Sequence, residues 1–163
     1  MTDFASLVDA HSAGLFAYLW RLLREPADAE DCLQETLLRA YRAFPRLNGH
    51  ANPQAWLYRI ATNTARTHLR QRARRTQRTA PLDPEAVGGG PGPADEVERR
   101  QALMRVAHAV EALPYHQRAA LILRKYQALS YAEVAAALDC TEAAARANVY
   151  QALKKLRSEL RGD

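Results

Sequence analysis

The sequence predicts an all-α fold of two small helical domains joined by a flexible linker, the second domain containing a helix-turn-helix. Apolar residues recur at helical spacing along most of the chain, and no stretch alternates between apolar and polar residues as a strand would. Residues 79–94 contain four prolines and four glycines and have no sustained apolar period, as is typical of a linker. We therefore expect domains at residues 1–78 and 95–163.

Two helices are expected at the start of the first domain. Apolar spacing predicts a helix from Phe4 to Leu23, ending before Pro26. Acidic residues from Asp28 onward favour the N-terminus of a second helix, which should run to about Phe44. Its expected core face consists of Leu33, Leu37, Ala40 and Phe44.

A third helix should begin with Asn52 as N-cap and Pro53 in the first turn, and continue to about Arg75. Helical spacing gathers one exposed stripe on it, made of Arg59, Asn63, Arg66, Arg70 and Arg74. With Trp56 beside it, this stripe could hold a nucleic-acid strand and stack an exposed base. The alternative is a solvated cationic face with a half-buried tryptophan.

The second domain should open with helices near residues 95–113 and 114–126. Ser130 and Glu133 then form a capping box for a short helix over 131–138. A tight turn at Asp139 leads into a longer helix from Thr141 to about Leu160. This order predicts a helix-turn-helix.

The longer helix of this motif should bury Ala145, Val149, Ala152 and Leu156. Its outward side chains are then Arg146, Asn148, Gln151 and Lys154, which are suited to guanine and adenine edges or to phosphate. Thr141 should cap the helix, and binding a phosphate is its alternative role.

Charge is distributed unevenly along the chain. Residues 1–78 hold 12 arginines against 7 acids, residues 79–98 hold 5 acids and no base, and residues 99–163 hold 11 basic residues against 6 acids. Two basic bodies therefore flank an acidic connector. Such bodies suit a polyanionic partner, although an inert basic surface is the alternative.

Several function classes are not indicated. The sequence has no phosphate-cradling glycine loop, nucleophile elbow or HExxH motif, so we expect no enzyme activity and no cofactor. Cys32 and Cys140 lack metal-ligand spacing, and no metal site is expected. No apolar run approaches the roughly 20 residues of a membrane span, so we expect a cytoplasmic protein without membrane insertion.

Four segments together resemble the extracytoplasmic-function (ECF) sigma factors of the sigma-70 class. They are residues 28–41, residues 56–63, the pair Leu113-Pro114 with Gln117-Arg118, and residues 129–135. The resemblance implies that the first domain corresponds to region 2 and the second to region 4, with no folded region 3 between them. It also implies a promoter-reading function, with core RNA polymerase and promoter DNA as partners.

The resemblance assigns roles to individual residues. A core-polymerase surface, directed at the β′ coiled coil, is implied for Asp31, Gln34, Glu35, Leu38 and Arg39. An apolar leucine among polar neighbours also favours a protein partner by itself. Capture of a flipped base of the minus-ten element is implied for the loop from Leu47 to Asn52, which includes Asn48, and for Asn63, beside the arginine stripe.

Region 4 would read the minus-thirty-five element through Arg146, Asn148 and Gln151, and the β flap would be its partner on the polymerase. The sequence departs from the family here, because relatives often carry arginine at positions 148 and 151. An anti-sigma factor is a further candidate partner, since relatives commonly have one.

Two rival functions stay open at this point. A free-standing helix-turn-helix regulator with an N-terminal sensor would explain the second domain only. A helical adaptor that binds protein alone would make the arginine stripe incidental.

Overall fold

The computed structural model describes residues 3–47, 52–78 and 93–162, and every regular element in them is helical. This confirms the predicted all-α class. In chain order the elements are α1 (Phe4–Leu23), α2 (Pro26–Ala43), the 3-10 turn η1 (Phe44–Arg46), α3 (Pro53–Arg78), α4 (Ala94–Glu111), α5 (Tyr115–Lys125), α6 (Tyr131–Leu138) and α7 (Glu142–Leu160). The predicted linker lies outside the described residues, apart from its last two positions.

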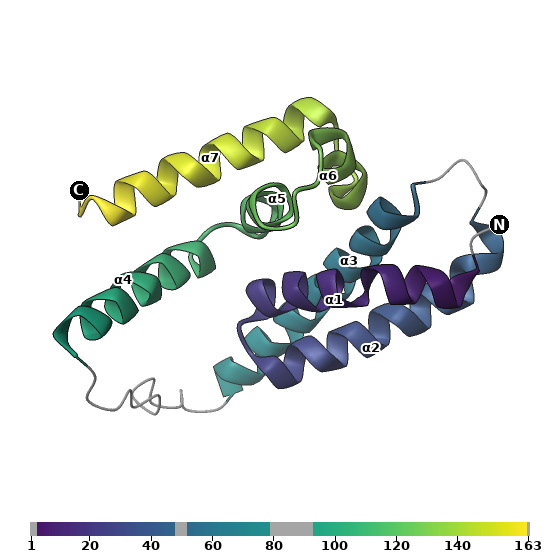
Figure 1. The fold of residues 1–163 in the computed structure, drawn as a ribbon, viewed down its shortest axis with the longest axis horizontal. Helices are drawn as coiled ribbons and strands as arrows, with labels where there is room; N and C mark the ends of the chain where they lie inside the picture. The colour runs from purple at the N-terminus through teal and green to yellow at the C-terminus, as the bar shows by residue number, and fades with distance from the viewer. Residues whose placement is uncertain (1–2, 48–51, 79–92, 163) are drawn as a thin grey trace.

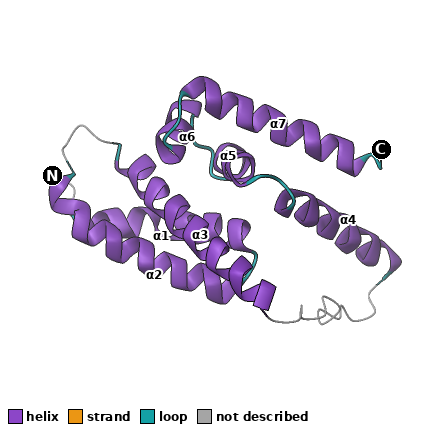
Figure 2. Cartoon of the chain, turned by 180° about the vertical axis from the view of Figure 1, so that it is seen from behind, coloured by secondary structure: helices purple, strands orange, loops and turns teal. Residues whose placement is uncertain are grey.

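Helices α1, α2 and α3 pack against one another as a three-helix unit, and α4 to α7 form the second half (Figure 1). Seen from behind, α5 and α6 lie between α7 and the three-helix unit (Figure 2). The halves touch where α6 contacts α3 and α5 contacts α1. The two parts of the chain are therefore docked in this structure.

The first helix starts and stops by local means that the sequence contains. The Asp3 carboxylate accepts a hydrogen bond of 2.7 Å from the Ser6 backbone N–H and so caps α1. Hydrogen bonding to the side chain of Ser6, followed by the bond to its backbone N–H, lowers the pKa of Asp3, because both favour the ionised carboxylate. At the other end Arg24 adopts the left-handed conformation, with φ 58°, and the chain turns into α2.

The predicted core face of α2 needs correction. Its fully buried residues are Ala29, Cys32, Thr36 and Ala40, whereas Leu33, Leu37 and Phe44 are only half-buried at the edge of the core. Small side chains along the centre of the helix let α1 and α3 approach closely. The spacing of apolar residues favours the bulkier leucines, because it reflects hydrophobicity alone. The distance between neighbouring helices, which selects small side chains, is not contained in that spacing.

Side-chain hydrogen bonds cap the start of α6 and of α7, and a left-handed residue forms the turn between the two helices. The Ser130 backbone N–H donates to Glu133 Oε1 at 3.0 Å, and the Glu133 N–H donates to Ser130 Oγ at 3.1 Å, which completes the predicted capping box. Asp139 is left-handed, with φ 55° and ψ 49°, a conformation that Asp tolerates better than most residues. Thr141 Oγ1 accepts from the Ala144 N–H at 3.0 Å and caps α7. The predicted helix-turn-helix is confirmed.

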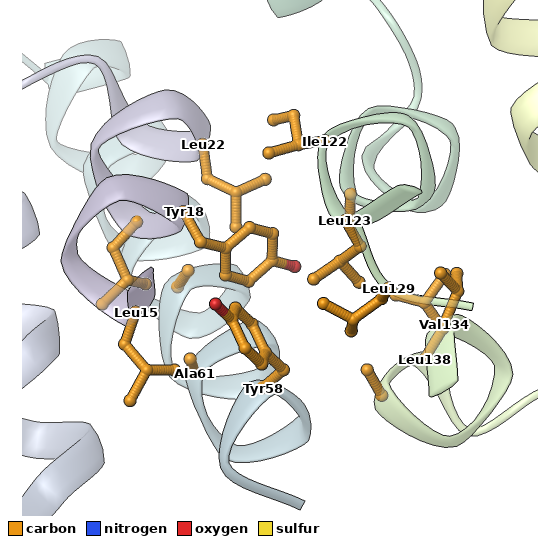
Figure 3. Packing of buried hydrophobic residues seen from close by; sticks show 14 of the residues in the cluster. Leu15, Tyr18, Leu22, Tyr58, Ala61, Ile122, Leu123, Leu129, Val134 and Leu138 are labelled. Atoms are coloured by element: carbon orange, nitrogen blue, oxygen red, sulfur yellow. The ribbon is translucent and has the colours of Figure 1, made fainter. Parts of the chain in front are cut away.

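One apolar core runs through both halves. Figure 3 shows Tyr18 and Leu22 of α1 facing Ile122 and Leu123 of α5, with Leu129 close by. All five side chains are at most 1% exposed. Helices from both halves therefore share one buried interior.

Candidate nucleic-acid and protein interfaces

The exposed face of α2 carries the side chains predicted to bind a protein partner. Asp31, Gln34, Glu35, Leu38 and Arg39 are all exposed. Leu38 is 47% exposed, and Glu35 Oε1 accepts from Arg39 Nε at 2.8 Å, one helical turn away. The structure thus brings this predicted set together on a single face, opposite the small buried residues of the helix.

The structure adds Tyr41 to this face. Tyr41 is 63% exposed, and its ring packs edge-on against Phe4. Tyr41 follows Leu38 by three residues, so helical spacing could have identified it as a second apolar contact beside the leucine. Two neighbouring exposed apolar side chains among charges make a stronger indication of a protein partner than Leu38 alone.

The cationic stripe of α3 is solvent-exposed along its length, at Arg59, Asn63, Arg66, Arg70 and Arg74. The opposite side is buried at Leu57, Ala61 and Thr64, with Ile60 half-buried. Trp56 is half-buried against the apolar core, which limits the ring area left for stacking on a base. The stripe can therefore offer guanidinium groups and one short amide to a polyanion.

Asn52 has two bonding partners at the start of α3. Its Oδ1 accepts from the Ala55 N–H at 3.2 Å, as expected of an N-cap, and its Nδ2 donates to Glu133 Oε2 at 3.1 Å. Asn48 lies outside the described residues, so the predicted base-capturing loop is represented in the structure by Leu47 and Asn52.

A structural cluster beside the stripe was not identified from the sequence. Arg72 Nη1 donates to both the Leu23 carbonyl and Asp28 Oδ2, each at 3.1 Å, and thereby ties α3 to the α1–α2 turn. His68 Nε2 lies 3.1 Å from Asp28 Oδ1 without the alignment of a hydrogen bond. Arg72 therefore differs in function from the arginines of the stripe: its guanidinium holds the three-helix unit together.

In α7 the inward residues Ala145, Val149 and Ala152 are buried, and Leu156 is half-buried. Of the outward set, Arg146, Gln151 and Lys154 are exposed, whereas Asn148 is half-buried. Arg146 Nη2 donates to Glu142 Oε1 at 3.1 Å, and its guanidinium lies 4.3 Å from the centroid of the Tyr131 ring. These contacts hold the arginine in a defined position at the exposed start of the helix.

The two cysteines are free thiols in an unreactive setting. Cys32 is buried, and burial, followed by the charges of Asp28, Asp31 and Glu35, raises the pKa of its thiol to about 11. Burial and Asp139 also raise the pKa of Cys140. Because the thiolate is the nucleophile and the metal ligand, neither thiol is activated for chemistry.

Comparison with known proteins gives the same division of the chain. Residues 7–75 match the family Sigma-70 region 2, and residues 103–156 match Sigma-70, region 4. The RNA polymerase sigma-H factor of Pseudomonas aeruginosa is 30% identical, over 96% of this chain and 86% of its own length. The ECF RNA polymerase sigma-E factor of Escherichia coli (strain K12) is 32% identical, over 82% of this chain and 74% of its own length.

A solved structure covers both halves. The sigma factor RpoE from Bartonella quintana, in complex with the anti-sigma factor NepR, matches with a TM-score of 0.75 and 27% identity over 100% of this chain and 99% of that chain.

An exposed cationic helix and a capped helix-turn-helix in one all-helical chain define a DNA-binding transcription protein. More narrowly, the chain belongs to the ECF group of the sigma-70 family of RNA polymerase sigma factors, with regions 2 and 4. It directs promoter-specific transcription initiation with RNA polymerase, and its region 4 helix-turn-helix binds DNA. Sigma factors are non-catalytic initiation factors.

Among the described helices, none has the length and apolar character to cross a membrane.

Proposed function

We propose that α2 binds the β′ coiled coil of core polymerase, that α3 holds the minus-ten element, and that α7 reads the minus-thirty-five element. The observation that carries this division is the exposure of three chemically different faces on three helices. The α2 face is mixed in charge with Leu38 and Tyr41, the α3 stripe is cationic, and α7 presents Arg146 at its start. A mixed apolar and charged face suits a protein, whereas cationic and amide faces suit DNA.

Within the minus-ten surface, we assign base capture to Asn52, Asn63 and the loop before α3, and phosphate contacts to Arg59, Arg66, Arg70 and Arg74. A short exposed amide can hydrogen-bond the edge of a flipped base, whereas a guanidinium on a flexible stem can follow the backbone of the melted strand. The half-buried Trp56 would support the base from the side of the core.

Within region 4, we assign base reading to Arg146 and Gln151, and phosphate contact to Lys154. Thr141 is already engaged as a cap, which supports a positioning role. Asn148 is half-buried, and this supports a smaller share in base reading than its sequence position suggested. The β flap would be the partner of region 4 on polymerase.

An anti-sigma factor is the remaining proposed partner, and the protein would act in the cytoplasm, where its polymerase lies. Support comes from the Bartonella quintana relative, which was solved with such a factor, and from the apolar side chains Leu103 and Met104 exposed on α4. Replacing Leu103 with Glu should lower the affinity for that factor and leave core binding unchanged; equal affinity would remove α4 from the interface.

Reconstituted transcription with purified core polymerase tests the proposed function. Promoter-dependent transcripts that require this chain are the expected result. DNA binding without any association with core polymerase would instead indicate a free-standing regulator, and core association without promoter selectivity would indicate an adaptor.

A further inference from the structure

An aromatic ring on the first helix of the helix-turn-helix contacts the arginine that is proposed to read the minus-thirty-five element. The Arg146 guanidinium lies over the Tyr131 ring, 4.3 Å from its centroid. Tyr131 is the first residue of α6, and Arg146 lies near the start of α7. The two helices pack against each other (Figure 1). This contact therefore joins the helices of the motif at the proposed reading surface.

Three features fix the position of the Tyr131 ring. Tyr131 follows Ser130 directly, at the capped start of α6. It is half-buried and packs against the apolar core. The Arg124 guanidinium also lies over the ring, 4.5 Å from the centroid, and its Nη1 donates to the Leu129 carbonyl at 3.0 Å. The ring is therefore held in place before any DNA binds.

Arg146 depends on its neighbours for a defined position. Its side chain is 60% exposed, and an exposed arginine has many rotamers to lose when it is fixed. Its hydrogen bond to Glu142 pairs two side chains that are both more than half exposed, so solvent weakens this contact. The contact with Tyr131 has the half-buried partner. The ring therefore contributes the larger part of the restraint.

The contact with the ring also leaves the arginine free to bind a base. Cation–π attraction acts on the charge of the guanidinium and needs no hydrogen-bond donor. A guanidinium has five N–H donors, and Glu142 accepts from one of them at 3.1 Å. Two donors for the N7 and O6 atoms of a guanine are therefore available while Arg146 stays over the ring.

We propose that Tyr131 is a positioning residue for recognition of the minus-thirty-five element. Its ring restricts the Arg146 guanidinium before DNA binds, so less conformational freedom is lost when the guanidinium pairs with a guanine edge. Tyr131 acts through Arg146 and needs no contact with a base. This proposal rests on the base-reading role proposed for Arg146, and it adds a residue of α6 to the determinants of base preference.

The test uses holoenzyme, reconstituted from the full chain and core polymerase, and a promoter library randomised in the minus-thirty-five element. Tyr131→Leu removes the ring and keeps an apolar side chain against the core, whereas Tyr131→Phe keeps the ring. Tyr126→Leu is the matched control, because the Arg21 guanidinium lies over the Tyr126 ring at 4.5 Å, at the end of α5 and outside the proposed DNA-binding surfaces. Arg146→Ala identifies the base position that Arg146 reads.

At that position, Tyr131→Leu should reduce the base preference about threefold to tenfold, because DNA must then immobilise the arginine. Tyr131→Phe and Tyr126→Leu should stay within about twofold of the wild type, since the first keeps the cation–π contact and the second changes a remote one. Added to Arg146→Ala, Tyr131→Leu should change the preference no further.

Two outcomes would overturn the proposal. In the first, Tyr131→Leu lowers transcription from all promoters alike and leaves the base preference intact, as the loss of a purely structural residue would. In the second, Tyr131→Phe loses as much preference as Tyr131→Leu.

If Tyr131→Leu does not fold, nuclear magnetic resonance on the wild-type chain decides. It measures the mobility of each arginine at its Nε–H group and the chemical shifts of its δ protons. Arg146 should be less mobile than Arg157, an exposed arginine further along α7, and the ring should shift the Arg146 δ protons upfield. Equal mobility of the two arginines, or unshifted Arg146 protons, would contradict the proposal.

The same promoter library separates this proposal from the function on which it rests. A preference that is lost in Arg146→Ala and kept in Tyr131→Leu contradicts the positioning role and leaves the base-reading role of Arg146 standing. A preference that is kept in Arg146→Ala contradicts the base-reading role itself, and with it the basis of the proposal.

Discussion

The hydroxyl of Tyr18 lies 2.7 Å from the hydroxyl of Thr62, and both side chains are buried where α1 meets α3. Thr62 Oγ1 also donates to the Tyr58 carbonyl at 2.6 Å. A threonine hydroxyl has one proton, so Tyr18 is the donor in the bond between the two hydroxyls. This buried run of hydrogen bonds fixes the spacing of α1 and α3, the two helices that contact the second half.

Removing the Thr62 hydroxyl and removing the Tyr18 hydroxyl should have unequal effects on stability. Thr62→Val leaves the buried Tyr18 phenol without an acceptor and should lower the free energy of unfolding by about 1–3 kcal/mol, whereas Tyr18→Phe should cost about 1 kcal/mol. The double variant should cost less than the sum, since no polar group is then left unpaired. Urea unfolding followed by circular dichroism measures all three, and a larger loss for Tyr18→Phe would contradict the assignment of the donor.

Stability should fall at alkaline pH because of buried tyrosines between the halves. Burial raises the pKa of Tyr58 to about 12, and burial also raises the pKa values of Tyr18 and Tyr115. An unfolded tyrosine loses its proton near pH 10, so unfolding releases protons above that pH and the free energy of unfolding decreases as pH rises. Urea unfolding between about pH 9 and pH 11.5 should show this loss, and Tyr115→Phe should make it shallower. Identical slopes for the two proteins would exclude Tyr115 as a contributor.

Binding to core polymerase should depend on the exposed face of α2. Gln34→Ala with Glu35→Lys should weaken core binding while the fold stays intact, because both side chains are exposed and the Glu35–Arg39 pair is a surface pair. Asp9→Lys, at an exposed position of α1, is the matched control for charge. Affinity for core polymerase is measured by fluorescence titration. Unchanged affinity with native helicity would remove α2 from the interface.

The α3 stripe should separate base reading from phosphate binding. Asn63→Ala should change the preference at one minus-ten position, because its exposed amide is suited to a base edge. Arg66→Ala or Arg70→Ala should weaken open-complex formation at all promoters alike and reduce its salt dependence. Transcription from a promoter library shows both effects. A shift in base preference from the arginine variants, with none from Asn63→Ala, would reverse the assignment.

Discrimination at the minus-thirty-five element should depend on Arg146. Its guanidinium is held beside Tyr131 and Glu142, so little conformational freedom is lost on binding a guanine. Arg146→Ala should reduce discrimination there by about 1–3 kcal/mol if the contact is bidentate. Lys154→Ala, at an exposed position further along α7, should lower affinity without changing preference. The same promoter library measures both variants, and a change of minus-ten preference by Arg146→Ala would contradict the division between the regions.

Much of the local structure could be predicted because its causes lie within one helical turn. The Ser130–Glu133 capping box, the Asn52 cap and the left-handed Asp139 depend on residues at most a few positions apart, and all three are present. Exposure of Leu38 and of the α3 stripe followed from helical spacing in the same way. Tyr41 obeys the same rule, because it follows Leu38 by three residues on the exposed face of α2.

The sequence by itself determined the all-α class, the order of the helices, the helix-turn-helix and the exposed faces that carry charge. The tertiary structure decided which small residues of α2 meet the neighbouring helices and which partners the stripe has in the free chain. The bond between Asn52 and Glu133 spans 81 positions, and the pairing of Arg59 with Asp139 likewise joins the two halves. No local pattern contains such pairings, because they result from how buried surfaces of separate segments fit together.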